Sequence, residues 1–550
     1  MMKQAEEKKT VILLSLLPLG LVVLCFLLPY GAALSSSFSK GFNYIREVIF
    51  DKSDLAKTVT FTFTQAFLST LLALALGLPG AWFLGKTESR EKKVLRALTG
   101  IPFALPSILV VLGFVLFFGN AGWLNKFIML ITGKDEGPIR ILYRPAAIIL
   151  AHAFYNFPLV IRLVGDTISR IKQSYIPAAE NLGASPFKSS ITIILPLLLP
   201  AIISAALLIF LYCFTSFAIV QVLGGGPPAT TLGVEIYRYA NIAFDYAQAG
   251  IFAAIETCIA LAVFLLYLYF DRKSRTLTGA AEDTRGNGGT INQSSKKYNW
   301  IFLLYAIVIC IFIAGPILSI LLESFLFQRS RAAPVFSLQN WINTGTLFSS
   351  LFNSLSLAVL AASTSVFIGF LAASSYRMLN PSSRWRPVLH TGFSMLLLSS
   401  GVVLGFGWLM LYRNIGIPVF VSLILMHALS AFPFSFFSIL EGLNGISNNT
   451  LNAASLAGAN PLRKISSVIL PSIFPRLSSA WAFAFAVSMG ELNTVLMLGS
   501  SDWITLPLYI YRAAGSYRFG TACVGGTVLI LFTLITFYFS DLSIRKTRNQ

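Results

Sequence analysis

Ionisable side chains interrupt several apolar stretches of this 550-residue sequence, and their types could contact a small molecule or an ion. His152 and His427 lie 275 residues apart, and a proline follows each of them six residues later. Glu256 and Glu491 lie in two other apolar stretches, with Asn493 two residues beyond the second glutamate. An ionisable group costs about 2.5–3.5 kcal/mol at the centre of a membrane helix, so such groups commonly mark a pathway. We interpret all five as candidates for a substrate path, with Glu491 suited to a cationic substrate; hydrogen bonding within helix packing is the alternative.

The sequence lacks the patterns that mark catalysis or metal binding. Its three histidines and five cysteines lie in apolar runs, and their spacing forms neither a metal-ligand set nor a nucleophile–base pair. Residues Gly80–Thr87 read GAWFLGKT and match the phosphate-binding pattern G-x-x-x-x-G-K-[ST]. That loop needs a preceding strand and exposed backbone N–H groups, whereas this segment ends an apolar run. The sequence therefore predicts no enzyme, no metal site and no cofactor bound by this chain.

Composition and apolar runs predict an all-α polytopic membrane protein. Hydrophobic residues make up 56% of the chain and charged residues 11%, against about 25% charged in soluble domains. A membrane-spanning helix needs about 20 apolar residues. The twelve runs of suitable length are approximately 11–34, 58–84, 97–119, 145–161, 197–223, 247–270, 300–322, 350–375, 387–411, 415–440, 477–498 and 519–540.

The basic residues predict how these runs are oriented. With the N-terminus inside, 25 of the 41 lysines and arginines fall on the cytoplasmic side, mostly in short loops. We therefore expect a multi-pass protein of the bacterial inner membrane with both termini cytoplasmic. The net charge of +19 is then a membrane feature, with lipid rather than nucleic acid as its partner. The run 11–34 is taken as a span, with a cleaved signal peptide as the alternative.

A 24-residue block occurs twice, as Pro177–Pro200 and Asn452–Pro475, at an offset of 275 residues. The identical pairs include Ala178/Ala453, Ala179/Ala454, Gly183/Gly458, Ala184/Ala459, Pro186/Pro461, Leu195/Leu470, Pro196/Pro471 and Pro200/Pro475. Such a repeat indicates an internal duplication. We expect two parallel six-helix repeats, 1–275 and 299–550, joined by a polar, Gly-rich cytoplasmic linker at 276–298.

The repeated block also predicts a docking element. Its alanines and glycines leave one face of a short helix nearly bare, so another protein can approach closely. Pro186 and Pro461 then interrupt the helix. The alternative for a single copy is an interfacial helix that packs on its own membrane domain.

At these residues the chain resembles the permeases of ABC importers. The blocks look like the EAA loop of that family, E-A-A-x-x-x-G followed by I-x-L-P, although Pro177 and Asn452 replace the glutamate. The resemblance implies coupling loops at about 170–196 and 445–471. It implies that Ala178, Ala179, Gly183 and Ala184, with Ala453, Ala454, Gly458 and Ala459, contact an ABC ATPase dimer that holds ATP and Mg²⁺. It also implies a periplasmic or lipid-anchored substrate-binding protein on the outer face.

A narrower resemblance concerns the cargo. The segments Cys213–Tyr246 and Thr505–Phe519 look like the matching stretches of fused thiamine-type permeases. The function implied is import of thiamine or its phosphates, with ferric iron as the alternative. An ion-coupled secondary transporter is the alternative from another class, since it too often has twelve spans in two parallel halves.

Overall fold

The computed structural model describes most of the chain. The described residues are 15–51, 53–85, 105–171, 175–224, 229–279, 300–327, 335–342, 344–379, 385–398, 400–499 and 503–548, with the single residues 99, 102, 226 and 383.

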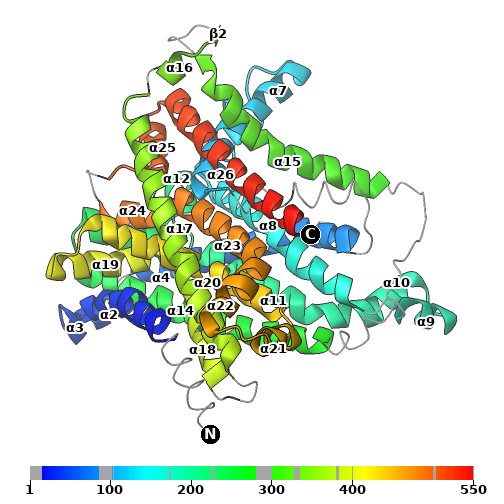
Figure 1. Cartoon of the computed structure of the whole chain (residues 1–550). Coiled ribbons are helices and arrows are strands. Elements are labelled where there is room, and N and C mark those ends of the chain that lie inside the picture. The colour runs from blue at the N-terminus through cyan, green and yellow to red at the C-terminus, as the bar shows by residue number, and fades with distance from the viewer. Residues whose placement is uncertain are drawn as a thin grey trace.

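The described chain is almost entirely helical, and its elements follow one another in a similar order in the two halves (Figure 1). The first half contains η1 (Val23–Leu27), α2 (Leu28–Ser35), η2 (Ser36–Phe38), α3 (Phe42–Arg46), η3 (Glu47–Asp51), α4 (Ser53–Gly85), α6 (Ser107–Phe118), α7 (Trp123–Thr132), α8 (Pro145–Arg170), α9 (Tyr175–Asn181), α10 (Pro186–Ser189), η4 (Ser190–Ile194), α11 (Leu195–Phe214), α12 (Ala218–Leu223), α13 (Leu232–Tyr237), η5 (Arg238–Ile242) and α14 (Tyr246–Gly279). The second half contains α15 (Trp300–Ser324), β1 (Leu326–Phe327), β2 (Val335–Phe336), α16 (Gln339–Ile342), α17 (Leu347–Met378), α18 (Trp385–Ser394), η7 (Met395–Leu398), α19 (Gly401–Ile415), α20 (Val419–Asn444), α21 (Asn448–Leu456), α22 (Pro461–Lys464), η8 (Ile465–Ile469), α23 (Leu470–Gly490), α24 (Asn493–Leu498), α25 (Leu506–Gly515) and α26 (Phe519–Arg548). The strands β1 and β2 pair antiparallel.

Eleven helical segments of the described chain are long and apolar enough to cross a membrane. They correspond to eleven of the twelve predicted runs. The prediction of one helix for the ninth run, 387–411, was wrong. The chain is divided there into α18, η7 and the shorter apolar helix α19. Ser400 separates them: its hydroxyl accepts a hydrogen bond from the N–H of Val403 and so caps α19.

Two further predicted spans, 197–223 and 477–498, are interrupted rather than continuous. Helix α11 ends at Phe214 and α12 begins at Ala218, while α23 ends at Gly490 and α24 begins at Asn493. The two breaks are equivalent in the duplicated halves. Non-helical backbone at membrane depth is tolerated where it is buried in protein or lines a cavity, so the breaks indicate an interior path.

Each half has the same central pair of packed helices, α4 on α8 and α17 on α20. Glycine allows both crossings to be close. A Cβ atom at Gly77 would lie 2.5 Å from Cβ of Val160, and one at Gly369 would lie 3.1 Å from Cβ of Ser435. Val160 and Ser435 are 275 residues apart, so the two crossings are copies of one another.

The halves also exchange their first helices. Helix α2 packs on α19 of the second half (Figure 1). Helix α15 packs on α6 of the first half. Both contacts bring a glycine against a proline-containing turn. A Cβ at Gly407 would overlap the carbonyl oxygen of Pro29, and one at Gly113 would lie 2.8 Å from Cβ of Pro316. The indole N–H of Trp408 also donates to the carbonyl of Cys25, at 3.2 Å.

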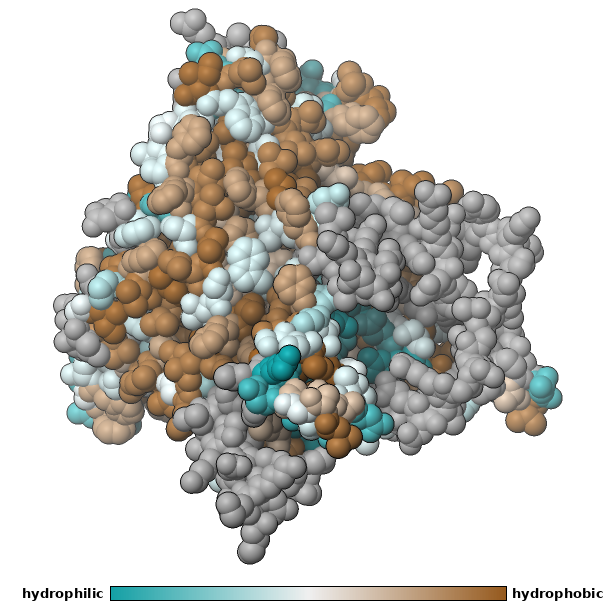
Figure 2. Space-filling view, viewed as in Figure 1, coloured by the Kyte–Doolittle hydropathy of each residue, from teal (hydrophilic) through white to brown (hydrophobic). Residues whose placement is uncertain are grey.

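The surface reflects the expected membrane environment. Figure 2 shows hydrophobic side chains over α17 and α26, whereas hydrophilic side chains gather around α21 and α22. Large apolar residues such as Leu303 and Phe367 are more than half exposed on the outer sides of α15 and α17. The predicted linker 276–298 continues α14 as far as Gly279, and its remaining residues lie outside the described chain.

An ion pair joins the connection after η2 to the start of α14. The ammonium of Lys40 lies 2.7 Å from the carboxylate of Asp245, which also accepts a hydrogen bond from the hydroxyl of Tyr44. Partial burial would raise the pKa of Asp245, but hydrogen bonds from Lys40, the backbone N–H of Gln248 and Tyr44 lower it below its usual value. Helix α14 begins one residue after Asp245, whereas α26 of the second half begins one residue after Arg518, so this carboxylate is not duplicated.

Candidate functional site

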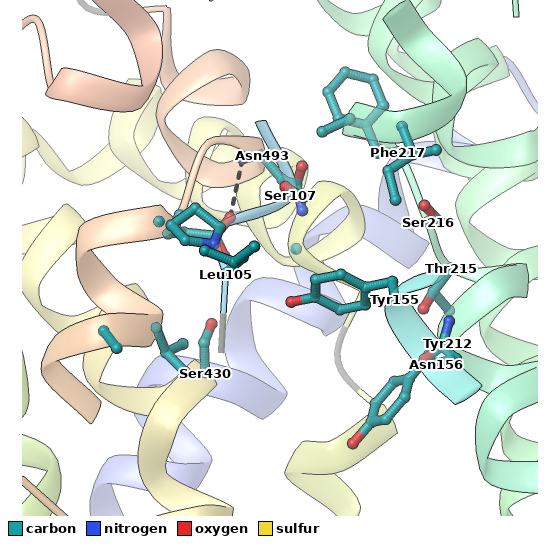
Figure 3. Close-up of a pocket in the computed structure, with 18 of the residues that line it drawn as sticks. Leu105, Ser107, Tyr155, Asn156, Tyr212, Thr215, Ser216, Phe217, Ser430 and Asn493 are labelled. Carbon is teal, nitrogen blue, oxygen red and sulfur yellow. Dashed lines mark hydrogen bonds between the residues drawn. The ribbon is translucent and has the colours of Figure 1, made fainter. Parts of the chain in front are cut away.

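A cavity of about 270 Å³ lies between the two halves, and helices of both form its wall (Figure 3). Tyr155 and Tyr212 contribute from α8 and α11, while Phe434 and Phe483 contribute from α20 and α23. In Figure 3 the hydroxyl of Tyr155 points into the open space. Small-molecule sites usually measure about 300–1,000 Å³, so this cavity lies near the lower limit.

The helix breaks supply the polar part of the wall. Thr215 and Ser216 follow the end of α11, and Glu491 follows the end of α23. All three line the cavity. Because the chain leaves the helix at these points, polar side chains and backbone groups can face the interior, as in transporters with discontinuous helices.

Part of the wall is built from equivalent positions that carry different residues. The pairs Tyr155/Ser430, Tyr212/Val487, Thr215/Gly490, Ser216/Glu491 and Ala218/Asn493 are each 275 residues apart, and all ten residues line the cavity. The duplication has therefore kept the positions of the wall while its chemistry became unequal.

His152 borders the cavity and is held by two serines. Its Nε2 lies 2.8 Å from the hydroxyl of Ser216, and its Nδ1 lies 3.4 Å from the hydroxyl of Ser69. A neutral imidazole donates from one nitrogen and accepts at the other, and a hydroxyl can do either. The side chain is 1% exposed, so the ring is buried behind the wall and contacts Ser216, which also lines the cavity.

The structure places His427 and Glu256 outside the lining of this cavity. His427 is buried, and its Nδ1 lies 2.9 Å from the hydroxyl of Ser488. Glu256 is buried on α14 beside Gly233 of α13. The two histidines that are equivalent in sequence therefore occupy different settings, one at the wall and one within helix packing.

Glu491 and Asn493 lie together at the second-half break. Oε1 of Glu491 accepts hydrogen bonds from the backbone N–H groups of Asn493, at 2.9 Å, and of Thr494, at 3.2 Å. The carboxylate thus caps the start of α24 with one oxygen. Oδ1 of Asn493 has no hydrogen-bond partner among the described residues. Glu491 is the carboxylate of the wall, and Asn493 adds a neutral amide beside it.

Sequence reasoning missed the aromatic residues of the wall. Tyr155 lies three residues after His152, so both fall on one face of a helix, and that spacing was the available signal. No such signal marks Phe434 and Phe483, because phenylalanines are frequent throughout the apolar runs and most of them face lipid or other helices.

The two repeated segments fold alike on the surface. Helix α9 is followed by α10 and the π-helical turn η4, and α21 is followed by α22 and η8. The N–H of Ala184 donates to the carbonyl of Ala179 at 3.0 Å, and the N–H of Ala459 donates to the carbonyl of Ala454 at 3.0 Å. Both bonds reach back five residues, which is typical of a Schellman cap with a left-handed glycine.

The repeated glycines meet that conformational requirement. Gly183 has φ +85° and Gly458 has φ +78°, a region that other residues rarely adopt. A Cβ at either position would meet nothing within 4 Å. The left-handed backbone conformation therefore explains why glycine occupies both positions. No other described atom lies close enough to exclude a larger side chain there.

Both segments present side chains to solvent. Leu182 is 89% exposed and Leu456 is 90% exposed. Of the predicted docking residues, Ala178 and Ala453 are exposed, while Ala179, Ala184, Ala454 and Ala459 are half-buried. Helix α21 has no buried residue at all. These exposed leucines contribute an apolar surface that the described chain does not cover.

The prolines that follow explain why both segments enter the membrane through a widened turn. Pro196 and Pro471 occupy the second position of α11 and α23, and each is preceded by the π-helical turn, η4 or η8. Proline lacks a backbone N–H, so one bond of the helical ladder is missing and the turn widens around the ring. The same device therefore connects each surface segment to a helix that ends at the cavity.

Known proteins match both halves. Residues 77–276 and 365–549 match the family described as binding-protein-dependent transport system inner membrane component. The thiamine transport system permease protein ThiP of Haemophilus influenzae is 28% identical over 537 residues, which cover 94% of this chain and 95% of that protein. ThiP of Escherichia coli is 27% identical, with 89% of each chain covered. The spermidine/putrescine transport system permease protein PotB of Escherichia coli is 30% identical over 40% of this chain and 78% of that protein.

These matches confirm the sequence-based prediction of a polytopic, duplicated membrane permease. The two matched segments together cover more than half of the chain. The chain therefore belongs to the family of binding-protein-dependent transport system inner membrane components, and it is the permease subunit of an ABC importer.

Proposed function

We propose that this permease carries thiamine or its phosphates into the cytoplasm. The observation that carries the proposal is the nearly end-to-end similarity to proteins named as thiamine transport system permeases, at 94% coverage of this chain. Similarity at 28% identity leaves room for a change of cargo, so the chemistry of the cavity is the second line of support.

The cavity wall suits a small aromatic cation. Thiamine joins a cationic thiazolium ring to a pyrimidine ring. Tyr155, Phe434 and Phe483 offer aromatic faces, and Glu491 offers a carboxylate. A cation over an aromatic face gains about 0.5–2 kcal/mol, with the larger values in desolvated sites. These residues form the proposed substrate contacts, and His152 positions Ser216 beside them.

The twin surface segments are the proposed contacts for an ATPase dimer, which binds ATP and Mg²⁺. Two similar sockets, at α9–α10 and α21–α22, fit the two equivalent subunits of such a dimer. Helix α11 leads from the first socket to Thr215, and α23 leads from the second to Glu491. Each helix of about 20 residues spans about 30 Å, so movement of a socket is carried to the cavity wall.

The remaining features of the proposal concern the membrane. The permease lies in the bacterial inner membrane with both termini and both sockets in the cytoplasm. A periplasmic or lipid-anchored binding protein delivers the cargo to the opposite face. The permease itself hydrolyses nothing, because the ATPase subunits supply the nucleotide chemistry.

Uptake by reconstituted vesicles tests this function. The permease is inserted with its ATPase partner, ATP is enclosed on the ATPase side, and labelled thiamine is offered with the cognate binding protein outside. We expect ATP-dependent accumulation of thiamine and no accumulation of labelled ferric ion. Uptake driven by an ion gradient in vesicles without the ATPase would instead identify a secondary transporter.

A further inference from the structure

A second cleft, of about 470 Å³, opens between the C-terminal part of α14 and α18. Helix α14 belongs to the first half and α18 to the second, so the cleft crosses the boundary between them. It shares no lining residue with the central cavity. The cleft is therefore separate from the proposed substrate path.

One stripe of α14 forms most of this cleft and changes character along its length. Leu265, Leu268 and Tyr269 come first, and Arg272 and Lys273 follow. Spacings of three and four residues place these side chains on neighbouring parts of one helix face. Leu265 is 55% exposed and Tyr269 is 60% exposed. The stripe thus runs from exposed apolar groups through an aromatic ring, of the kind enriched at membrane interfaces, to two cations.

The two cations are free to bind an anion. Nη2 of Arg272 lies 3.4 Å from the hydroxyl of Thr391 on α18, a long hydrogen bond that uses one of the five guanidinium donors. Among the described residues, no carboxylate forms an ion pair with Arg272 or Lys273. The hydroxyl of Thr276 donates to the carbonyl of Arg272 and is already satisfied. Arg272, Lys273 and Thr391 therefore provide the available donors.

The cleft opens on the same side of the molecule as the twin surface segments. Arg377, at the end of α17, donates hydrogen bonds to the carbonyl groups of Leu443 and Ile446, just before α21. Helix α18 begins soon after Arg377, at Trp385. With the membrane orientation proposed above, this side faces the cytoplasm, where anionic lipids give the leaflet a negative surface potential.

We propose that this cleft binds one anionic glycerophospholipid. The phosphate lies between Arg272, Lys273 and the hydroxyl of Thr391, and an acyl chain lies along Leu265 and Tyr269. Arginine can contact a phosphate through two parallel N–H groups, whereas lysine acts as a point charge. Because the donors come from both halves, the bound lipid stabilises the arrangement in which α14 and α18 are adjacent.

Native mass spectrometry of the purified full-length chain tests the site directly. The protein is titrated with phosphatidylglycerol, or with phosphatidylcholine that has the same acyl chains. We expect the first phosphatidylglycerol to bind about tenfold more tightly than phosphatidylcholine, because two cations face the phosphate and neither is ion-paired with a carboxylate of the described chain. The double variant Arg272→Gln/Lys273→Gln should lose this preference while phosphatidylcholine binding stays unchanged. Thr391→Val should weaken phosphatidylglycerol binding about twofold.

Two controls distinguish a bound lipid from a general effect of charge and from a soluble anion. Arg162→Gln removes one positive charge from an exposed position on α8 and should leave the preference intact. Inorganic phosphate at millimolar concentration should not displace the lipid; displacement would assign the cleft to a soluble anion and overturn the proposal. Retention of the preference by the double variant would overturn it as well.

A measurement on the unmodified protein keeps the test independent of folding of the variants. Phosphatidylglycerol with a photoreactive headgroup should crosslink to peptides that contain residues 265–276 or Thr391. Crosslinks confined to other peptides would contradict the site.

Discussion

After the same duplication, the two surface segments have remained alike, whereas the two sides of the cavity wall have diverged in residue type. At the surface, α9–α10 and α21–α22 share residue types, left-handed glycines and backbone hydrogen bonds. At the cavity, equivalent positions are kept but their chemistry diverges, as with Ser216 against Glu491. A partner made of two equal subunits requires two equal sockets. A single small cargo in one cavity imposes no such equality, so the wall is free to become polar on one side and acidic on the other.

Glu491→Gln should have the largest effect, because it removes the acidic side of the wall. The amide retains the oxygen that caps α24, so the fold should persist. A hydrogen bond to a charged group contributes about 1.5–3 kcal/mol, which predicts a loss of uptake of about ten- to a hundredfold for a cationic cargo. The initial rate of thiamine uptake at low concentration measures this. Glu136→Gln, which removes a surface carboxylate paired with Arg140, is the control. Unchanged uptake in Glu491→Gln would remove the acidic contact from the mechanism.

Charges on the exposed leucines test the equality of the two sockets. Leu182→Glu and Leu456→Glu each place a carboxylate on a surface proposed to meet the ATPase. Since a buried unpaired charge costs several kcal/mol, we expect binding to weaken on the order of a hundredfold or more, so that little ATPase co-purifies in either case. Asn452→Glu is the matched control, because it adds the same charge where the family pattern carries glutamate. A large effect in one copy alone would show that the sockets are not equivalent.

Alanine at the repeated glycines should destabilise both segments equally. Gly183→Ala and Gly458→Ala force a Cβ into left-handed backbone, which costs about 1–2 kcal/mol. Asparagine tolerates this conformation better, so Gly→Asn at either position should cost less. Hydrogen exchange of residues 175–189 and 448–464 measures local stability. An equal loss of local stability in the two variants would support the same helix cap in both segments. A loss at only one glycine would contradict it.

Serine substitutions beside the two histidines should have unequal effects on transport. Ser216→Ala and Ser488→Ala each remove one hydrogen bond to an imidazole, so each should lower stability by about 1 kcal/mol. Only Ser216 lines the cavity, so only Ser216→Ala should also change the concentration dependence of uptake. Thermal unfolding and uptake curves on the same preparations distinguish the two effects. Equal loss of transport in both variants would argue for a path past His427.

The unduplicated ion pair should have the smallest effect. The pKa of Asp245 is lowered in the folded protein, so its stabilisation is present at neutral pH and is lost as the pH falls through the folded value. Because Lys40 and Asp245 are partly exposed, Asp245→Asn should cost only about 0.2–1 kcal/mol at pH 7. The difference from the unmodified protein should shrink as the pH falls below about 4, since the folded pKa lies under the ordinary aspartate value. A difference that grows on acidification would contradict this assignment.

The sequence predicted the architecture because membrane spans and a duplication leave strong signals. Long apolar runs indicated eleven of the spans, and the ungapped block marked the two surface segments. The glycine of that block was attributed to a bare docking face, whereas the structure adds the left-handed cap that fixes it. An ungapped repeat in the sequence indicates that a local structure occurs twice. It does not show whether the side chain or the backbone conformation requires the glycine.

The interior was less predictable, because breaks inside apolar runs have no strong sequence signal. Neither Thr215–Phe217 nor Glu491–Leu492 contains a proline, and the apolar runs 197–223 and 477–498 resume or continue beyond both. A tertiary contact accompanies the second break, because Pro106 packs where a Cβ of Gly490 would lie, at 2.7 Å. The unequal roles of His152 and His427 were hidden for the same reason, since their surroundings come from distant helices.

The exchange of first helices has a consequence for biogenesis. The contact between Trp408 and Cys25 joins residues 383 positions apart. At about 5–20 residues per second, the ribosome needs on the order of tens of seconds to synthesise the partner of the first helix. During that interval the N-terminal helix contacts lipid or insertion factors instead of α19. It can reach its final position only after most of the protein has left the ribosome.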